Sequence, residues 1–84
     1  MQLTIMFYGH LGKAIGREVM FDASGAATIG ELRSKLGAKW PDHAAELRSD
    51  RLKSLIGDRF VDDDTALVGT SSVEFLPPVS GGGA

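Results

Sequence analysis

The segment from residue 28 to residue 41 constrains the fold most, because it carries a start signal and a stop signal for one helix. Thr28 is a good N-cap, and Glu31 three residues later completes a capping box. Trp40-Pro41 ends the helix, since proline disfavours α geometry in the residue before it. We therefore predict one long helix that begins after Thr28 and ends at Trp40.

This helix has one apolar stripe and a polar remainder. Ile29, Leu32 and Leu36 fall at positions i, i+3 and i+7, which is the spacing of a helix packed on a sheet. We expect the cationic side chains to point away from that sheet; they are Arg33, Lys35 and Lys39.

Shorter segments before and after the helix have the pattern of strands. Leu3, Ile5 and Phe7 alternate with more polar residues, which predicts a strand with one buried face. The other predicted strands are 18–22, with Val19 and Phe21 inward, 52–56, 59–61 and 73–76. One or two helical turns are expected within 9–16, and a short helix or irregular loop within 42–51. A helix that crosses between strands lets the first and last strands pair in parallel at the centre of one sheet.

The last eight residues, 77–84, contain two prolines and three glycines and no side chain able to build a core. Each proline fixes φ and lacks a backbone donor, so Pro77 and Pro78 stiffen the exit from the domain. The glycines have no Cβ and fit spaces in which another residue would clash. We divide the chain into a domain at 1–76 and a flexible tail at 77–84, whose terminus is either the working part or an ordinary frayed end.

The segment Phe75-Leu76-Pro77-Pro78-Val79-Ser80-Gly81-Gly82 resembles the C-terminal signature of the ubiquitin-like sulfur carriers, most closely that of the small subunit of molybdopterin synthase. The opening run 5–16 and the helix start Thr28-Ile29-Gly30-Glu31-Leu32-Arg33 are similar to that family too. The resemblance implies an α+β fold, the ubiquitin-like β-grasp, with a mixed sheet packed on one main helix.

The same resemblance implies a function. An ATP-dependent partner resembling ubiquitin-activating enzymes would adenylate the terminal glycine, Gly82, and sulfur would convert it to a thiocarboxylate. The large subunit of molybdopterin synthase would then receive this sulfur and pass it to cyclic pyranopterin monophosphate. The chain itself is expected to hold no cofactor and to lack catalytic activity alone; ATP is used by the activating partner.

The chain departs from the family pattern at its end. Active members end at the second glycine, whereas here Gly83 and Ala84 follow Gly82. We expect that a protease removes these two residues, that this form is not a working carrier, or that they are a cloning remnant. Full-length protein is therefore expected to accept sulfur poorly.

A docking surface is expected beside the tail. Val73 and Phe75 share one face of the last strand, and Glu74 on the other face prefers water, which leaves Leu76 exposed. Phe60 would extend this apolar surface if it lies on the neighbouring outer face, and clustered exposed apolar residues mark interaction sites. The resemblance assigns partner binding to Phe60, Leu76, Pro77, Pro78 and Val79, with Gly81, Gly83 and Ala84 as further tail residues.

Other chemistries find little support. The chain has no cysteine, so carried sulfur must sit on the terminus. A net charge of -2 offers no basic footprint for nucleic acid. The glycines of Gly9-His10-Leu11-Gly12-Lys13 are too close together for a phosphate loop. Asp62-Asp63-Asp64 fits a solvated turn better than a calcium loop. His10 and His43 are expected at the surface, and no metal site is predicted.

The start of the chain lacks a basic leader, and no run reaches the ~20 apolar residues of a membrane span, so we expect a cytoplasmic protein. Three alternatives remain open. The chain could carry sulfur for cysteine, thiamine or tRNA-thiolation pathways after trimming of Gly83-Ala84. It could be a ubiquitin-like modifier that forms isopeptide bonds with lysines, or an interaction domain with an inert tail.

Overall fold

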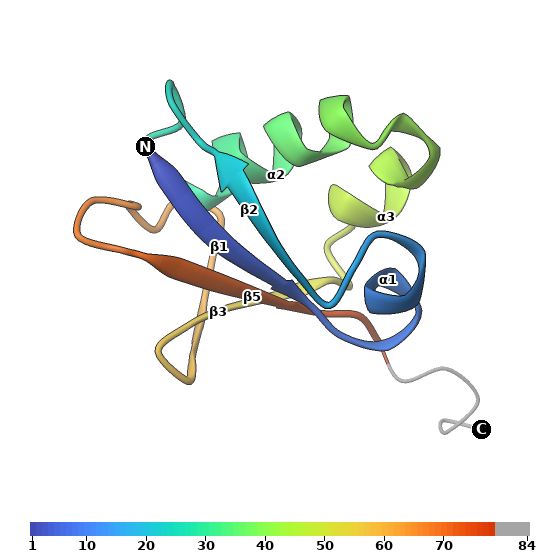
Figure 1. Cartoon of the computed structure of the whole chain (residues 1–84). Coiled ribbons are helices and arrows are strands. Elements are labelled where there is room, and N and C mark those ends of the chain that lie inside the picture. The colour runs from blue at the N-terminus through green and yellow to red at the C-terminus, as the bar shows by residue number, and fades with distance from the viewer. Residues whose placement is uncertain (79–84) are drawn as a thin grey trace.

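The computed structural model describes residues 1–78, and Val79–Ala84 lie outside the described part. Strands and helices follow one another in the order that the sequence predicts (Figure 1). The elements are β1 (Gln2–Phe7), α1 (Gly9–Ala14), β2 (Glu18–Asp22), α2 (Ile29–Lys39), a 3₁₀ turn η1 (Pro41–His43), α3 (Ala44–Leu47), β3 (Lys53–Ile56), β4 (Arg59–Val61) and β5 (Ser72–Leu76).

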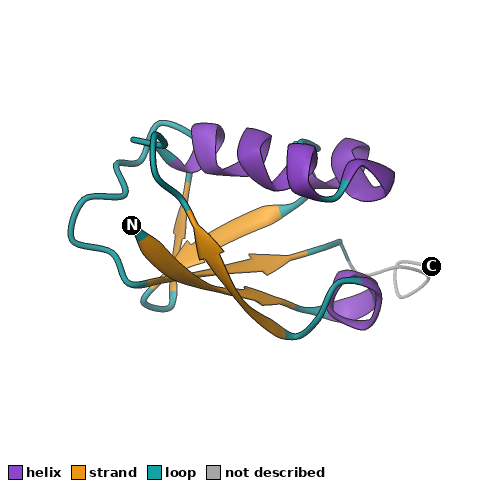
Figure 2. Cartoon of the chain, turned by 45° about the horizontal axis from the view of Figure 1, so that its top comes forward, coloured by secondary structure: helices purple, strands orange, loops and turns teal. Residues whose placement is uncertain are grey.

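The strands of this part of the chain form one mixed sheet in the order β2-β1-β5-β3-β4. β1 and β5 are parallel neighbours at the centre, and the β1–β2, β3–β5 and β3–β4 pairs are antiparallel. Helix α2 covers one face of the sheet (Figure 2). This is the β-grasp arrangement, and the predicted parallel pairing of the first and last strands is confirmed.

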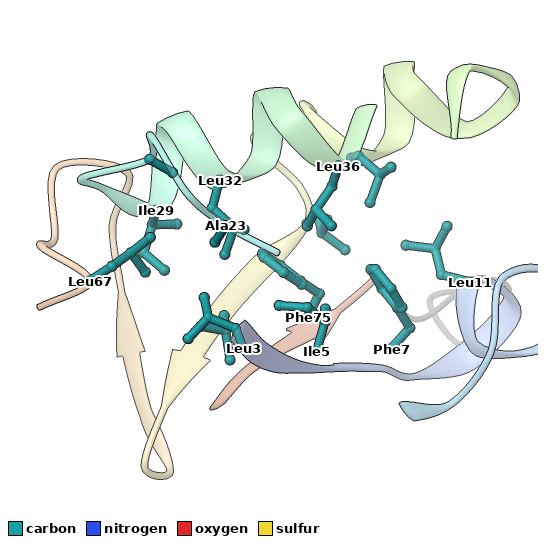
Figure 3. Close-up of a cluster of buried hydrophobic side chains, with 14 residues drawn as sticks. Leu3, Ile5, Phe7, Leu11, Ala23, Ile29, Leu32, Leu36, Leu67 and Phe75 are labelled. Atoms are coloured by element: carbon teal, nitrogen blue, oxygen red, sulfur yellow. The ribbon is translucent and has the colours of Figure 1, made fainter. Parts of the chain in front are cut away.

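The core lies between α2 and the covered face of the sheet (Figure 3). The alternating residues Leu3, Ile5 and Phe7 of β1 are fully buried, as is the predicted apolar stripe of α2. Phe7 stacks on Phe75 with ring centroids 5.8 Å apart. Burial of such side chains contributes ~1.5–3 kcal/mol each, so the sheet-to-helix interface supplies much of the stability.

The start of α2 is capped much as predicted, with one difference. The Thr28 side chain accepts a hydrogen bond from the Glu31 N–H at 3.2 Å. The Glu31 carboxylate accepts from the N–H of Ala27 at 2.6 Å, rather than from that of Thr28. The Glu31 carboxylate therefore binds the N–H one residue earlier than in a standard capping box, and this N–H belongs to the loop before the helix.

Arg33 lies off the apolar stripe of α2, yet its side chain is not exposed to solvent. This residue is only 5% exposed. Its Nε donates to the Leu47 carbonyl at 2.7 Å, and its other nitrogens donate to the Ser49 carbonyl and to Asp63, the latter at 3.0 Å. Carbonyls left unpaired after the short helix α3 need donors, and a guanidinium can supply several at once. Arg33 thus fastens α2 to the 47–49 segment and to the 62–65 turn.

Candidate functional site

The site begins where β5 ends and the tail starts. Leu76 is 39% exposed on the uncovered face, as predicted, whereas Pro77 is buried and Pro78 is exposed. Pro77 packs against Gly9, which has φ +64°; a Cβ added at Gly9 would lie 3.0 Å from Pro77 Cγ. The Tyr8 N–H donates to the Phe75 carbonyl at 3.1 Å just before this contact. The direction in which the tail leaves the domain is therefore fixed as far as Pro77.

An apolar groove lies on one side of this exit, and we call it the tail-base groove. It encloses about 400 Å³ and is lined by Asp50, Arg51, Lys53, Phe60, Leu76, Pro77 and Pro78. The structure therefore brings together the predicted partner-binding residues that it describes. Phe60 is 67% exposed, which is unusual for a large aromatic side chain on a sheet. Val79 and the tail residues Gly81, Gly82, Gly83 and Ala84 lie outside the described residues.

Two cations border the tail-base groove, and the sequence reasoning missed both. Lys53 lies directly opposite Leu76 in the antiparallel β3–β5 ladder. Arg51 lines the groove from the loop before β3. Their position follows from the register of β3 against β5, which no local pattern in the sequence specifies. The groove therefore offers an apolar floor bordered by these two cations and by the Asp50 carboxylate, so its charged border is positive on balance.

A second groove of about 300 Å³ lies on the other side of the prolines. It is lined by His10, Glu46, Ser49, Arg51, Leu52, Pro77 and Pro78. His10 Nε2 pairs with the Glu46 carboxylate, which joins α1 to α3. The hydrogen bond from His10 lowers the pKa of Glu46 below its ordinary value, although partial desolvation opposes the shift.

The two histidines meet the same carboxylate. His43 Nδ1 lies 3.7 Å from Glu46 and forms no hydrogen bond within the described residues. His10 is exposed as predicted, whereas the His43 side chain is only 27% exposed. No local pattern in the sequence predicts this cluster, because His10 and Glu46 are 36 positions apart. No group of three or more residues in the described range is arranged to hold a metal ion.

The uncovered face of the sheet carries one further polar pair near the site. The Tyr8 hydroxyl donates to Glu74 at 2.9 Å. This hydrogen bond, together with partial desolvation and the negative charge of Glu74, raises the pKa of Tyr8. The Tyr8 side chain is therefore a neutral phenol near pH 7, and its hydrogen bond ties the residue that follows β1 to strand β5.

The remaining sequence candidates have structural roles. The Gly9–Lys13 segment forms helix α1, and a Cβ at Gly12 would lie 2.5 Å from the Phe7 carbonyl oxygen. Asp62 caps the predicted turn, because its carboxylate accepts from the Asp64 N–H at 3.0 Å and the Thr65 hydroxyl at 3.2 Å. No helix in residues 1–78 is long and apolar enough to cross a membrane.

The model of the ThiS family matches residues 5–82, so the match extends to Gly82. No curated protein sequence matches the chain significantly.

Among solved structures, the chain is similar to two crystal structures of small archaeal modifier protein 1 from Haloferax volcanii. The first has a TM-score of 0.75 at 24% identity and covers 96% of this chain and 99% of that chain. The second has a TM-score of 0.73 at 23% identity and covers 93% of this chain and 98% of that chain. At such low identity these similarities show the shared fold.

Proposed function

The chain belongs to the ThiS family of ubiquitin-like sulfur carriers and protein modifiers, and from that membership we propose that it is a sulfur carrier whose working group is the carboxylate of Gly82. The observation that carries the proposal is the family match across residues 5–82, ending at Gly82. The absence of cysteine from the sequence supports it, because no side chain offers a thiol for sulfur transfer. As in the sequence interpretation, the sulfur would go to molybdopterin synthase.

The chemistry follows from the weakness of a carboxylate as an electrophile. A partner enzyme would use ATP to convert the Gly82 carboxylate to an acyl adenylate, releasing pyrophosphate. Hydrosulfide would then attack the acyl carbon and displace AMP, leaving a thiocarboxylate. A persulfide donor would first give an acyl disulfide, which a thiol must reduce. The thiocarboxylate sulfur is a soft nucleophile that the large synthase subunit would direct at the pyranopterin substrate.

The described part of the chain supplies a docking surface for these partners. The Gly9–Pro77 contact fixes the direction of the exit, and an extended chain from Pro78 to Gly82 would reach about 13 Å. Phe60 and Leu76 offer apolar area beside this exit, while Lys53 and Arg51 attract an acidic rim on a partner. Tethered delivery of a reactive group raises its effective concentration at the acceptor, which is the physical advantage of such a carrier.

The test is an intact-mass measurement on two versions of the protein, one ending at Gly82 and one ending at Ala84. Each is incubated with ATP, sulfide and an adenylating enzyme that acts on carriers of this family. We expect the version ending at Gly82 to gain the mass of one oxygen-to-sulfur exchange. The version ending at Ala84 should gain it far more slowly, unless a protease first removes Gly83-Ala84. Failure of both versions to accept sulfur would contradict the proposal.

A second candidate function is modification of other proteins through an isopeptide bond from Gly82 to lysine. The similarity to a protein named as an archaeal modifier favours this candidate. Both functions share the adenylated intermediate and differ in the nucleophile, sulfide or a lysine amine. Immunoblots of native cells distinguish them: covalent adducts of higher mass that survive thiol reductant indicate a modifier, and their absence together with a thiocarboxylate terminus indicates a carrier.

A further inference from the structure

Strand β2 is an edge of the sheet, because its one neighbour among the described strands is β1 (Figure 1). The Phe7 N–H donates to the Arg17 carbonyl at 3.1 Å, and the Ala23 N–H donates to the Met1 carbonyl at 2.7 Å. These two pairs lie in register with the β1–β2 ladder. Hydrogen-bonded pairs alternate along an antiparallel ladder, so the backbone groups of residues 17, 19, 21 and 23 point toward β1.

The backbone N–H and C=O groups of Glu18, Met20 and Asp22 therefore point away from β1, toward the open edge. The β1–β2 register is continuous from Glu18 to Asp22, so no bulge twists this edge away. The strand contains no proline and no lysine, two devices that commonly block edge pairing. The opposite edge strand, β4, has only three residues, whereas β2 has five. The edge of β2 can therefore pair with a strand centred on Met20.

The side chains at this edge determine which strand would fit. Glu18, Met20 and Asp22 lie on the uncovered face, and Met20 is 64% exposed. The Asp22 carboxylate accepts hydrogen bonds from the Ser24 N–H and hydroxyl and from the N-terminal ammonium at 3.3 Å, so a cation opposite Asp22 would share this carboxylate with the N-terminus. A second copy of the chain fits poorly, because antiparallel self-pairing centred on Met20 would place Glu18 of each copy opposite Asp22 of the other. Like charges directly opposite each other destabilise a ladder, whereas cations at those two positions would stabilise it.

The helix-covered side of the same edge is apolar. Val19 and Phe21 are partly buried there, and Phe21 packs against Trp40 with ring centroids 6.2 Å apart. Successive side chains of a strand point to opposite faces of the sheet. In an added strand, the residues one position before and one position after the residue opposite Met20 would therefore point toward this aromatic pair. Their preferred character is therefore apolar or β-branched.

We propose that the free edge of β2 binds an extended segment of another protein with a cationic residue two positions before and two positions after a central apolar residue. The main-chain groups of Glu18, Met20 and Asp22 provide the hydrogen bonds, and the two carboxylates select the cations. The pattern is symmetric about its centre, so it holds for either strand direction. This edge is formed by a different strand from those that line the tail-base groove, and the proposal does not depend on sulfur transfer.

The probe is a blocked synthetic peptide, Ser-Lys-Val-Leu-Val-Lys-Ser, titrated into ¹⁵N-labelled protein. We expect saturable amide shifts centred on Glu18, Met20 and Asp22, and a shift of the indole N–H of Trp40, the single tryptophan of the chain. A peptide with glutamates in place of the lysines, and one with both lysines at the same end, should bind at least about fivefold more weakly.

Two variants test the edge itself. Glu18→Lys reverses one of the selecting charges, and Met20→Pro removes a donor that points away from β1. Each should weaken the peptide at least about fivefold, and Glu18→Lys alone suffices if Met20→Pro does not fold. Glu74→Lys is the matched control, since it makes the same charge change on the same face in a central strand and should leave binding within about twofold.

Three results would overturn the proposal. They are an absence of saturable shifts, shifts centred on Phe60 and Leu76 instead, and equal weakening by Glu18→Lys and Glu74→Lys. In each case Glu18 and Asp22 would serve only to keep copies of the chain apart. A concentration-dependent dimer by sedimentation, lost on Met20→Pro and not on Glu74→Lys, would likewise contradict the assigned occupant.

Discussion

Gly9 and Pro77 are in direct contact, although 67 intervening residues separate them along the chain; a Cβ at Gly9 would lie 3.0 Å from Pro77 Cγ. The contact joins the start of α1 to the end of β5. Gly9 also has φ +64°, a conformation that residues with a Cβ adopt at a cost. Two separate physical reasons therefore favour glycine here, and both act on the geometry of the tail exit.

Replacing Gly9 by alanine should destabilise the protein by about 2–3 kcal/mol. About 1–2 kcal/mol comes from the left-handed backbone conformation, and the rest comes from the crowding against Pro77. Gly57→Ala is the matched control, because Gly57 has φ +57° but a Cβ added there would meet no atom within 4 Å apart from its immediate neighbours. Urea unfolding gives the free energy of unfolding of both variants, and the extra loss in Gly9→Ala measures the crowding against Pro77. Equal losses in the two variants would show that the Pro77 contact contributes nothing.

Replacing Arg33 by methionine should destabilise the protein by about 2–4 kcal/mol, because the carbonyls of Leu47 and Ser49 lose their donor in a largely buried setting. The same substitution at Lys39, an exposed position on the same helix, should change stability by less than about 0.5 kcal/mol. Denaturant unfolding measures both. A small effect of Arg33→Met would mean that water replaces the guanidinium at little cost.

Much of this fold could be predicted from local pattern. The period of two in β1 places Leu3, Ile5 and Phe7 inside, and the same parity argument in β5 places Leu76 outside. The stop at Trp40-Pro41 follows from the backbone limits of proline. These predictions succeed because each depends on residues close together in the sequence.

The missed features depend on residues far apart. The apolar stripe of α2 shows which side meets the sheet, but it does not reveal that Arg33 meets carbonyls 14 and 16 positions away. The pairing of His10 with Glu46 and the place of Lys53 beside Leu76 arise only when helices and strands assemble. The tail from Val79 onward lies outside the described residues, so its predicted roles stay predictions.

The Glu46 carboxylate should titrate below its ordinary value in the native protein and return toward it in His10→Gln. The hydrogen bond from His10 stabilises the charged carboxylate, so the native pKa lies below the ordinary value of 4.5. A lowered native pKa contributes stability above pH 4.5 that is lost as pH falls through the native pKa. A carbon-detected NMR titration of the Glu46 side chain in both proteins measures the change. An unchanged midpoint in His10→Gln would rule out His10 as the cause.

Phe60 should contribute more to the free energy of partner binding than an exposed apolar residue away from the tail does. Exposed aromatic side chains at the centre of an interface commonly contribute more than 1 kcal/mol, so Phe60→Ser should raise the apparent KM of the activating enzyme about tenfold. The kcat at saturation should change little, because the reacting terminus is untouched and only docking is weakened. Val68→Ser is the control, since Val68 is 87% exposed and does not line the tail-base groove. Sulfur acceptance at a series of carrier concentrations separates KM from kcat. If the two variants behave alike, the groove is not the docking surface, and the partners must recognise the tail alone.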